Sequence, residues 1–356
     1  MVPYSEVKCV HLEVTTRCNA SCPMCARNVS GGRVNPYLPV AELSLDDVRR
    51  ILPADLVRRL DHVYLCGNYG EPIVAADALP ILRHLRDSSS ALRLGVLTNG
   101  SARSAAWWSE LAGVVSYVQF GIDGLEDTNH LHRRGTSWAH LMSNAAAFIA
   151  AGGNAEWEMI VFEHNEAQVE EACRLAREMG FRAFRTRLTN RFFRGGRYQE
   201  EHPVLDEDGG RLYALRPPKR PELLNPAVAQ LKTRVESGEE HLRYLDATKI
   251  ECAAIADRKI YISAEGLVFP CCYTGHIYPW REFPNNQTWR TLEAHGGKDA
   301  IDARRRPLDE ILGGPLFRTV RESWTLPSIA AGKYSVCAAL CGQHPTVQSQ
   351  YTTSKI

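Results

Sequence analysis

The sequence predicts an α/β protein whose parallel sheet curves into an open, partial (β/α)6 barrel. Short apolar runs rich in β-branched residues recur six times within the first 190 residues, and such runs are typical of buried strands. The first five are each followed by a helical pattern, which implies right-handed crossovers between parallel strands. Because six units are too few for a closed eight-stranded barrel, we expect an open one with the carboxyl ends of all strands at one mouth.

The expected strands follow one another along the N-terminal half of the chain. They lie at residues 10–14, 63–66, 92–97, 117–122, 157–162 and 181–188. Between them, residues 44–51 begin with a capping-box pattern at Ser44, and residues 75–85 keep apolar side chains at helical spacing. Residues 166–179 form an amphipathic pattern that ends at Gly180, a residue type common at helix C-termini.

The segment RPPKRPELLNP at residues 216–226 marks a boundary, because its prolines lack the backbone donor that a helix or central strand needs. We therefore expect a barrel at residues 1–215, a linker or bridging region at 216–250 and a small α+β C-terminal domain at 251–356. Within the last part, residues 259–270 predict a β-hairpin around Gly266, and residues 308–324 predict a helix.

Composition limits the class of protein. The 356-residue chain has 44% hydrophobic and 23% charged residues and a net charge of +1, which is typical of a globular protein with no field that favours nucleic acid or an acidic membrane. It contains no apolar run of 18 residues and does not begin with a signal-peptide pattern, so we expect a cytoplasmic protein without membrane association. Its 11 cysteines then favour metal or cluster ligation over disulfides.

Three cysteines stand directly after the first expected strand, at the mouth of the barrel. Cys18, Cys22 and Cys25 form a C-x3-C-x2-C pattern in the segment CNASCPMC. A closed zinc site needs four protein ligands and usually pairs its cysteines as C-x2-C. The pattern instead suits a cubane iron–sulfur cluster held at three irons, with the fourth iron open to a non-protein ligand.

With this motif, the chain resembles the radical S-adenosylmethionine (SAM) superfamily, whose hallmark is C-x3-C-x-aromatic-C after the first strand of a partial barrel. Met24 stands at the aromatic position. Three further family-like segments follow on successive strands: GNYGEP at residues 67–72, LTNG at 97–100 and FGIDG at 120–124, where Gly121 replaces the usual serine. The resemblance implies SAM contacts from Gly70, Glu71, Asn99, Asp123 and Arg133, with Arg134 as the alternative to Arg133.

The resemblance also implies the chemistry. In this family the open iron of the 4Fe-4S cluster binds the amino and carboxylate groups of SAM, and an electron from the cluster cleaves the sulfonium. The resulting 5′-deoxyadenosyl radical abstracts hydrogen from a substrate. A reductant such as flavodoxin or ferredoxin would supply the electron.

A second group of cysteines lies in the C-terminal part. Cys252 is followed after thirteen residues by Gly266 and after four more by Cys271, and the segment CAALC spans Cys337 and Cys341. This order resembles the SPASM and twitch extensions of the superfamily, and specifically the shorter twitch form with one auxiliary 4Fe-4S cluster. The implied ligands are these four cysteines, for a total of two clusters. Cys272 is a rival ligand, and structural zinc is a rival occupant, because four thiolates also suit zinc.

Cys272 has a second reading. Peptide epimerases of the superfamily return a hydrogen atom to the substrate radical from a free thiol, and Cys272 beside the auxiliary cluster is a candidate for that role. A packed, inert thiol is the alternative, and this plainer reading also applies to Cys9, Cys66 and Cys173.

Residues 181–198 carry six arginines, from Arg182 to Arg197, interleaved with aromatic residues. Guanidinium groups bind carboxylate or phosphate through paired hydrogen bonds, which suits an anionic substrate or an acidic peptide segment. A solvated loop is the alternative. RNA stacking is a third reading, against which the neutral charge and the lack of a recognisable RNA-binding module count.

We expect a radical SAM enzyme that acts on a ribosomally synthesised peptide, by crosslinking, epimerisation, excision or decarboxylation. The alternatives are dehydrogenation or rearrangement of a small metabolite such as a sugar or nucleoside, and a non-catalytic iron–sulfur or zinc scaffold. Because the first strand begins close to the first residue, we also expect no N-terminal peptide-recognition domain. A peptide substrate would then need a separate leader-peptide-binding protein, or capture by the C-terminal domain.

Overall fold

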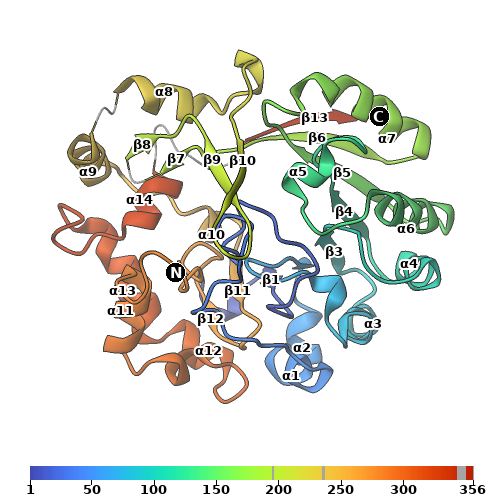
Figure 1. Cartoon of the computed structure of the whole chain (residues 1–356). Helices are drawn as coiled ribbons and strands as arrows, with labels where there is room; N and C mark the ends of the chain where they lie inside the picture. The colour runs from blue at the N-terminus through green and yellow to red at the C-terminus, as the bar shows by residue number, and fades with distance from the viewer. Residues whose placement is uncertain (195, 235–236, 343–349, 356) are drawn as a thin grey trace.

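The computed structural model describes residues 1–194, 196–234, 237–342 and 350–355. Among these residues, nine strands form one central sheet in the order β12-β11-β1-β2-β3-β4-β5-β6-β13 (Figure 1). The parallel strands at its centre are β1 Cys9–Leu12, β2 His62–Leu65, β3 Arg93–Thr98, β4 Tyr117–Gly121, β5 Ala155–Ile160 and β6 Ala183–Leu188. Each lies within two residues of its predicted bounds, so the predicted α/β class and partial barrel are confirmed.

Helices connect these strands along the outer face of the sheet (Figure 1). They are α1 Leu45–Ile51, α2 Ala54–Val57, α3 Ala78–Ser88, α4 Ala105–Ala112, α5 Asn129–His132, α6 Trp138–Ala150 and α7 Val169–Met179, with short 3-10 turns at η1 Tyr4–Glu6, η2 Pro72–Val74 and η3 Glu166–Gln168. The capping box at Ser44 is present. Gly180 ends α7 with a φ of 88°, a backbone conformation that glycine adopts without strain.

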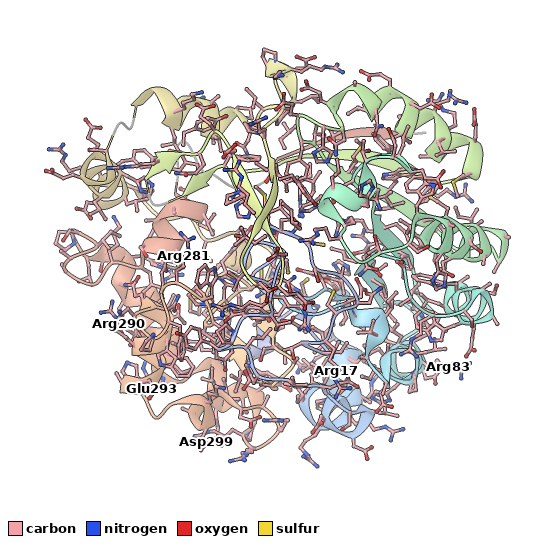
Figure 2. The ribbon with its side chains drawn as sticks, viewed as in Figure 1. Arg17, Arg83, Arg281, Arg290, Glu293 and Asp299 are labelled. Carbon is pink, nitrogen blue, oxygen red and sulfur yellow. The ribbon has the colours of Figure 1, made fainter. Side chains whose placement is uncertain are left out.

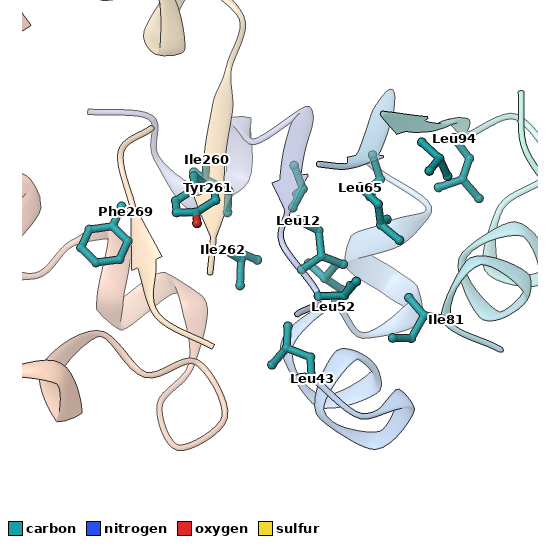
Figure 3. Close-up of a cluster of buried hydrophobic side chains, with 14 of the residues drawn as sticks. Leu12, Leu43, Leu52, Leu65, Ile81, Leu94, Ile260, Tyr261, Ile262 and Phe269 are labelled. Carbon is teal, nitrogen blue, oxygen red and sulfur yellow. The ribbon is translucent and has the colours of Figure 1, made fainter. Parts of the chain in front are cut away.

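The sheet presents two chemically different faces because side chains alternate along each strand. Leu12 and Leu65 pack with Leu43 and Leu52 in the hydrophobic core under the helices (Figure 3). Alternate residues of the same strands point into the barrel and are polar or aromatic. His11, for example, stacks on Tyr64 of β2 at 4.7 Å and contacts Tyr261 at 4.9 Å between ring centroids.

The predicted hairpin at 259–270 is confirmed, and it extends the barrel sheet. Strands β11 Lys259–Ile262 and β12 Val268–Phe269 pair antiparallel around Gly266, whose φ is 75°. Strand β11 also pairs in parallel with β1. The C-terminal part thus adds two strands to one edge of the barrel, and β13 Gln350–Lys355 adds one antiparallel to β6 at the other edge.

The helix predicted at 308–324 is wrong as a single element. The structure has α12 Leu308–Leu312, then α13 Pro315–Glu322 and the 3-10 turn η6 Ser323–Thr325. Gly313 and Gly314 separate the two helices, and Pro315 occupies the first turn of the second. Proline fits that position, where its missing N–H is not needed, but it interrupts a continuous helix.

The remaining elements are short. Two hairpins follow β6: β7 Phe193–Arg194 with β8 Arg197–Tyr198, and β9 His202–Leu205 with β10 Arg211–Leu215. Then come η4 Pro221–Leu223, α8 Pro226–Arg234, α9 Gly238–Ala247, α10 Ala253–Ala256, α11 Gln287–Ala294, η5 Lys298–Ile301 and α14 Ser335–Cys341. Exposed charges such as Arg281, Arg290, Glu293 and Asp299 lie on the outer side of this C-terminal part (Figure 2). In the part of the chain that the structure describes, no helix is long and apolar enough to cross a membrane.

Candidate functional site

The three N-terminal cysteines share one loop directly after β1. All three are free thiols, and the backbone N–H of Cys25 donates to the carbonyl of Cys22 at 3.0 Å. Burial raises the pKa of the Cys18 thiol, and the nearby Glu71, Cys22 and Cys25 raise it further. Burial also raises the pKa of the Cys22 thiol to about 11, although the neighbouring Arg133 opposes the rise. The loop therefore gathers three sulfur ligands next to a cation.

Arginines from other segments hold the backbone of this loop. Arg134 Nη1 donates to the carbonyls of Gly31 at 2.9 Å and Leu205 at 2.7 Å, and its own carbonyl accepts from the Ser21 N–H at 2.8 Å. Arg191 donates to the carbonyl of Met24. These contacts assign Arg134 to the loop backbone, whereas Arg133 and Arg191 both act electrostatically on the thiol of Cys22.

Met24 packs beneath the β9–β10 hairpin, in an apolar cluster that the sequence did not predict. Its partners come from four segments: Ile160, Phe162, Phe192, Val204 and Leu215. The side chain is 4% exposed. An unbranched apolar side chain fits such an irregular space, so the cluster gives a physical reason for methionine at the position where the resembling family has an aromatic residue.

The turn at residues 67–72, the GNYGEP segment, lies against the chain just before Cys18. The Glu71 N–H donates to the carbonyl of Arg17 at 2.8 Å; Arg17 is labelled in Figure 2. A Cβ atom on Gly70 would overlap the carbonyl oxygen of Thr15, so only glycine allows this approach. The predicted contact residues Gly70 and Glu71 are therefore adjacent to the cysteine loop.

Glu71 and Asn99 are joined to each other. The buried Glu71 carboxylate accepts from the Asn99 backbone N–H at 2.7 Å and from the Ile73 N–H at 3.4 Å, and burial raises its pKa. Asn99 Nδ2 in turn donates to Asn19 Oδ1 at 2.9 Å. Because Asn19 lies between Cys18 and Cys22, this chain of contacts links the ends of β2 and β3 to the cysteine loop.

Asp123 is fully buried at the end of β4 and anchors Arg133. Its Oδ2 accepts from Arg133 Nε at 2.6 Å and lies 2.6 Å from His132 Nδ1, while Oδ1 accepts from the Ile160 N–H at 2.7 Å. Burial acts to raise the pKa of Asp123, but Arg133 and His132 outweigh it and hold the pKa well below its usual range. A Cβ on Gly121 would overlap the Arg133 guanidinium. Glycine in place of the family's serine thus makes room for this ion pair.

The second group of cysteines lines one pocket. Cys252, Cys271, Cys337 and Cys341 meet there with the apolar side chains of Val320, Trp324, Val336 and Leu340. A hydrogen bond to Cys341, followed by burial, raises the pKa of the Cys252 thiol. The four thiols therefore meet in one pocket, where Cys252 and Cys341 are in hydrogen-bond contact with each other.

Cys272 does not line that pocket. Its carbonyl accepts from Asn68 Nδ2 at 2.8 Å, and its electrostatic neighbours include Cys66, Tyr64 and Glu13 of the barrel. Burial raises the pKa of its thiol to about 12. Of the cysteines expected to pack in the core, Cys9 is buried and Cys173 packs against the core cluster, whereas Cys66 lies near Cys272.

Half of the arginine-rich segment is committed to contacts within the chain. Arg185 pairs with Glu156, and Arg187 pairs with Glu158 at 3.2 Å, across the β5–β6 pair. Glu158 also accepts from Gln119 Nε2 at 2.8 Å. Together with Arg191, which binds the cysteine loop, these arginines have partners that sequence reasoning missed. The alternation of charged residues along β5 and β6 is the signal that points to them.

Comparison with protein families gives a match to the Radical SAM superfamily model over residues 12–190, just over half of the 356-residue chain. Among curated proteins, GTP 3′,8-cyclase of Pectobacterium atrosepticum is 32% identical over 119 residues, which are 33% of this chain and 34% of that protein. GTP 3′,8-cyclase of Cronobacter sakazakii is 33% identical over 119 residues with the same coverage. The match thus spans about a third of the length of these relatives.

Solved structures match nearly the whole chain. Streptococcus suis SuiB bound to S-adenosylmethionine has a TM-score of 0.54 at 14% identity and covers 94% of this chain and 72% of that one. Two structures of anSMEcpe, one with bound AdoMet and one with AdoMet and Cp18Cys peptide, have TM-scores of 0.53 and 0.52 at 14% and 13% identity. They cover 94% of this chain and 85% and 88% of theirs. At such identities the likeness shows a shared fold.

Replacing Gly121 with alanine should displace the Arg133 guanidinium from Asp123. We expect the free energy of unfolding to fall by roughly 1–3 kcal/mol, less than the cost of deleting one partner of a buried ion pair, because His132 and Ile160 still satisfy Asp123. Urea denaturation measures this. The matched control is Gly113→Ala, where the nearest atom to a new Cβ is 3.7 Å away. Equal effects of the two substitutions would contradict the assigned role of Gly121.

Proposed function

Because the chain belongs to the radical SAM superfamily, we propose that it is a peptide-modifying enzyme with two 4Fe-4S clusters, one in the cysteine loop and one in the C-terminal pocket. Membership of this family implies an enzyme that binds a 4Fe-4S cluster and SAM. The observation that carries the remainder is the separation of seven cysteines into two groups, three in one loop and four around one pocket. The predicted division at 1–215, 216–250 and 251–356 stays part of this proposal.

The residues of the cysteine loop fit the group that the family implies. Three free thiols are the donor set for a cluster with one open iron, and the adjacent Arg133 guanidinium is a cation beside the anionic thiolates. When bound, this cluster and SAM supply hydrogen abstraction from an unactivated carbon of the substrate. Cys18, Cys22 and Cys25 would hold the cluster.

The surrounding side chains would then orient SAM. Gly70 and Glu71 offer the backbone and carboxylate of the 67–72 turn to its amino group, and Arg133 offers a cation to its carboxylate. Asp123 acts through Arg133, with which it forms a buried ion pair. Asn99 positions Glu71 through its backbone N–H. The two carboxylates differ in their partners, because Asp123 is paired with an arginine whereas the oxygens of Glu71 accept from the Asn99 and Ile73 N–H groups.

We propose a 4Fe-4S cluster in the C-terminal pocket, with structural zinc as the rival occupant, because four thiolates also suit zinc. The support for a cluster is that the four cysteines whose order resembles the auxiliary-cluster extensions of the superfamily all line this one pocket. A cubane carries one thiolate on each of its four irons. Cys272 lies outside the lining, which favours Cys252, Cys271, Cys337 and Cys341 as the ligands.

Two substrate classes compete. A peptide is supported by the structural match to anSMEcpe, one structure of which contains bound Cp18Cys peptide. A nucleotide or other small metabolite is supported by the shorter match to GTP 3′,8-cyclases. We favour the peptide, modified by crosslinking, epimerisation, excision or decarboxylation, because that match extends over 94% of the chain. A separate leader-peptide-binding protein and a flavodoxin- or ferredoxin-type reductant would be its partners.

A non-catalytic scaffold is the third candidate. A scaffold does not need the complete cysteine triplet or the close packing of Gly70 and Glu71 against Thr15 and Arg17, which directly precede it. The test against it is cleavage of SAM by the reduced protein.

The reconstituted protein should contain about eight irons and eight sulfides per chain, since each cubane holds four of each. Replacing Cys18, Cys22 and Cys25 together with alanine should lower both to about four, and so should Cys252→Ala with Cys341→Ala. Anaerobic iron and sulfide analysis with EPR of the reduced protein measures this. Wild-type protein with about four irons plus zinc would contradict the auxiliary cluster and leave the first one standing.

Cys272→Ala should leave the iron content and the cleavage of SAM intact while abolishing product. In this role the Cys272 S–H bond breaks as a C–H bond forms on the substrate, and the sulfur radical regains an electron from the reductant and a proton from water. Mass spectrometry of product made in D2O measures the hydrogen returned. Unchanged product would exclude the donor role, and loss of about four irons would instead make Cys272 a ligand. Cys173→Ala, in α7, is the matched control.

A deuterated precursor peptide, taken from any short open reading frame found beside the gene, should transfer deuterium to 5′-deoxyadenosine when mixed with reduced protein and SAM. The expected product is a peptide of altered mass, detected by mass spectrometry, and the triple alanine variant of the cysteine loop should give none. Deuterium transfer from a labelled nucleotide or sugar, with none from any peptide, would establish the small-molecule alternative.

A further inference from the structure

Glu13, at the end of the first strand, is a buried carboxylate that sequence reasoning passed over. Its side chain is 1% exposed, and burial raises its pKa. Oε1 accepts from the backbone N–H groups of Tyr69 at 2.7 Å and Gly70 at 2.9 Å. Oε2 accepts from the hydroxyl of Tyr261. A buried carboxylate is tolerated only when such donors are in place. The burial of Glu13 therefore holds the Tyr69 N–H, the Gly70 N–H and the Tyr261 hydroxyl at their positions.

These donors belong to two distant parts of the chain. Tyr69 and Gly70 lie in the 67–72 turn, directly before Glu71. Tyr261 lies on β11, beside Phe269 of β12 (Figure 3). The same hairpin leads within two residues to Cys271, which lines the C-terminal pocket. One carboxylate thus connects the turn beside the cysteine loop with the hairpin that carries a predicted ligand of the second cluster.

Two further contacts join the same segments. Asn68 Nδ2 donates to the carbonyl of Cys272 at 2.8 Å, and the Tyr278 N–H donates to the Tyr69 hydroxyl at 3.1 Å. Three consecutive residues of the turn are therefore held from the C-terminal part or through Glu13. Gly70 lies so close to the Thr15 carbonyl that a Cβ atom would not fit between them. We therefore expect a shift of the hairpin to move the turn as well.

We propose that Glu13 is a positioning residue that couples the β11–β12 hairpin to the 67–72 turn, so that the occupied C-terminal pocket increases the affinity for SAM. The inference rests on the proposed function, because it takes the turn as part of the SAM site and the pocket as a cluster site. What the inference adds is an energetic coupling between the two sites. Two clusters could be present in the chain without such a coupling.

The direct test is Tyr261→Phe, which removes only the phenol hydroxyl and with it the hydrogen bond to Glu13. We expect SAM to bind roughly 3- to 10-fold more weakly, the range for one lost hydrogen bond, with iron content unchanged. Equilibrium dialysis of the reconstituted protein measures the affinity. The change that SAM causes in the EPR spectrum of the reduced cluster reports the same site. The matched control is Tyr64→Phe, a phenol in the same barrel interior that stacks on His11.

Substitution of Glu13 itself separates positioning from bulk stability. Glu13→Gln should stay near wild type, since an amide oxygen accepts from the same two N–H groups and its NH2 donates to the Tyr261 oxygen. Glu13→Ala should lose SAM binding. Hydrogen exchange of the Tyr69 and Gly70 amides, measured without any cofactor, should accelerate in Tyr261→Phe and not in Tyr64→Phe.

A double-mutant cycle tests the coupling. Cys252→Ala with Cys341→Ala should weaken SAM binding in the wild-type background and have little further effect in Tyr261→Phe. Additive effects, or equal SAM affinity in wild type and Tyr261→Phe, would overturn the coupling while the proposed function stands. A wild-type protein that assembles no cluster in the cysteine loop or binds no SAM would overturn the proposed function and the coupling with it.

Discussion

The carboxylate of Glu13 occupies a position where a strand, a turn and a hairpin meet, and its burial constrains all three. An unpaired charge in that place would cost several kcal/mol or more, so the two backbone amides and the Tyr261 phenol have to remain within hydrogen-bonding distance. The position of the turn follows from this requirement. Gly70 then has to approach the Thr15 carbonyl, and Glu71 is placed to accept from the Asn99 amide at the end of the next strand.

A second buried carboxylate organises the opposite side of the mouth. Asp123 satisfies the Ile160 amide and holds Arg133 next to Cys22, while the absence of a side chain on Gly121 leaves the space that the guanidinium needs. Arg134 and Arg191 bind loop carbonyls instead. The loop thus meets three cations: Arg134 binds backbone carbonyls, whereas Arg133 and Arg191 both lie close enough to Cys22 to oppose the rise of its pKa.

Local patterns were sufficient for much of this architecture. Apolar runs located six strands within two residues, and the Ser44 capping box and Gly180 marked helix ends. The resemblance to the auxiliary-cluster extensions implied the four cysteines that line one pocket. Pairing between distant segments was not predictable, since the short strand β11 carries no signal that it joins β1. The contacts of Glu13 and the choice between Arg133 and Arg134 depend on that pairing. The break at Gly313-Gly314-Pro315 was visible in the sequence and was missed.

Ion pairs between β5 and β6 bear on the prediction that the arginine-rich segment binds an anionic substrate. Arg185 and Arg187 each lie beside a glutamate, so their charges are neutralised before any substrate arrives. Binding an anion through them would require separating buried or half-buried pairs, which is costly because the glutamates would be left unpaired. The charges of Arg185 and Arg187 are therefore balanced within the sheet, and these two residues contribute to the pairing of β5 with β6.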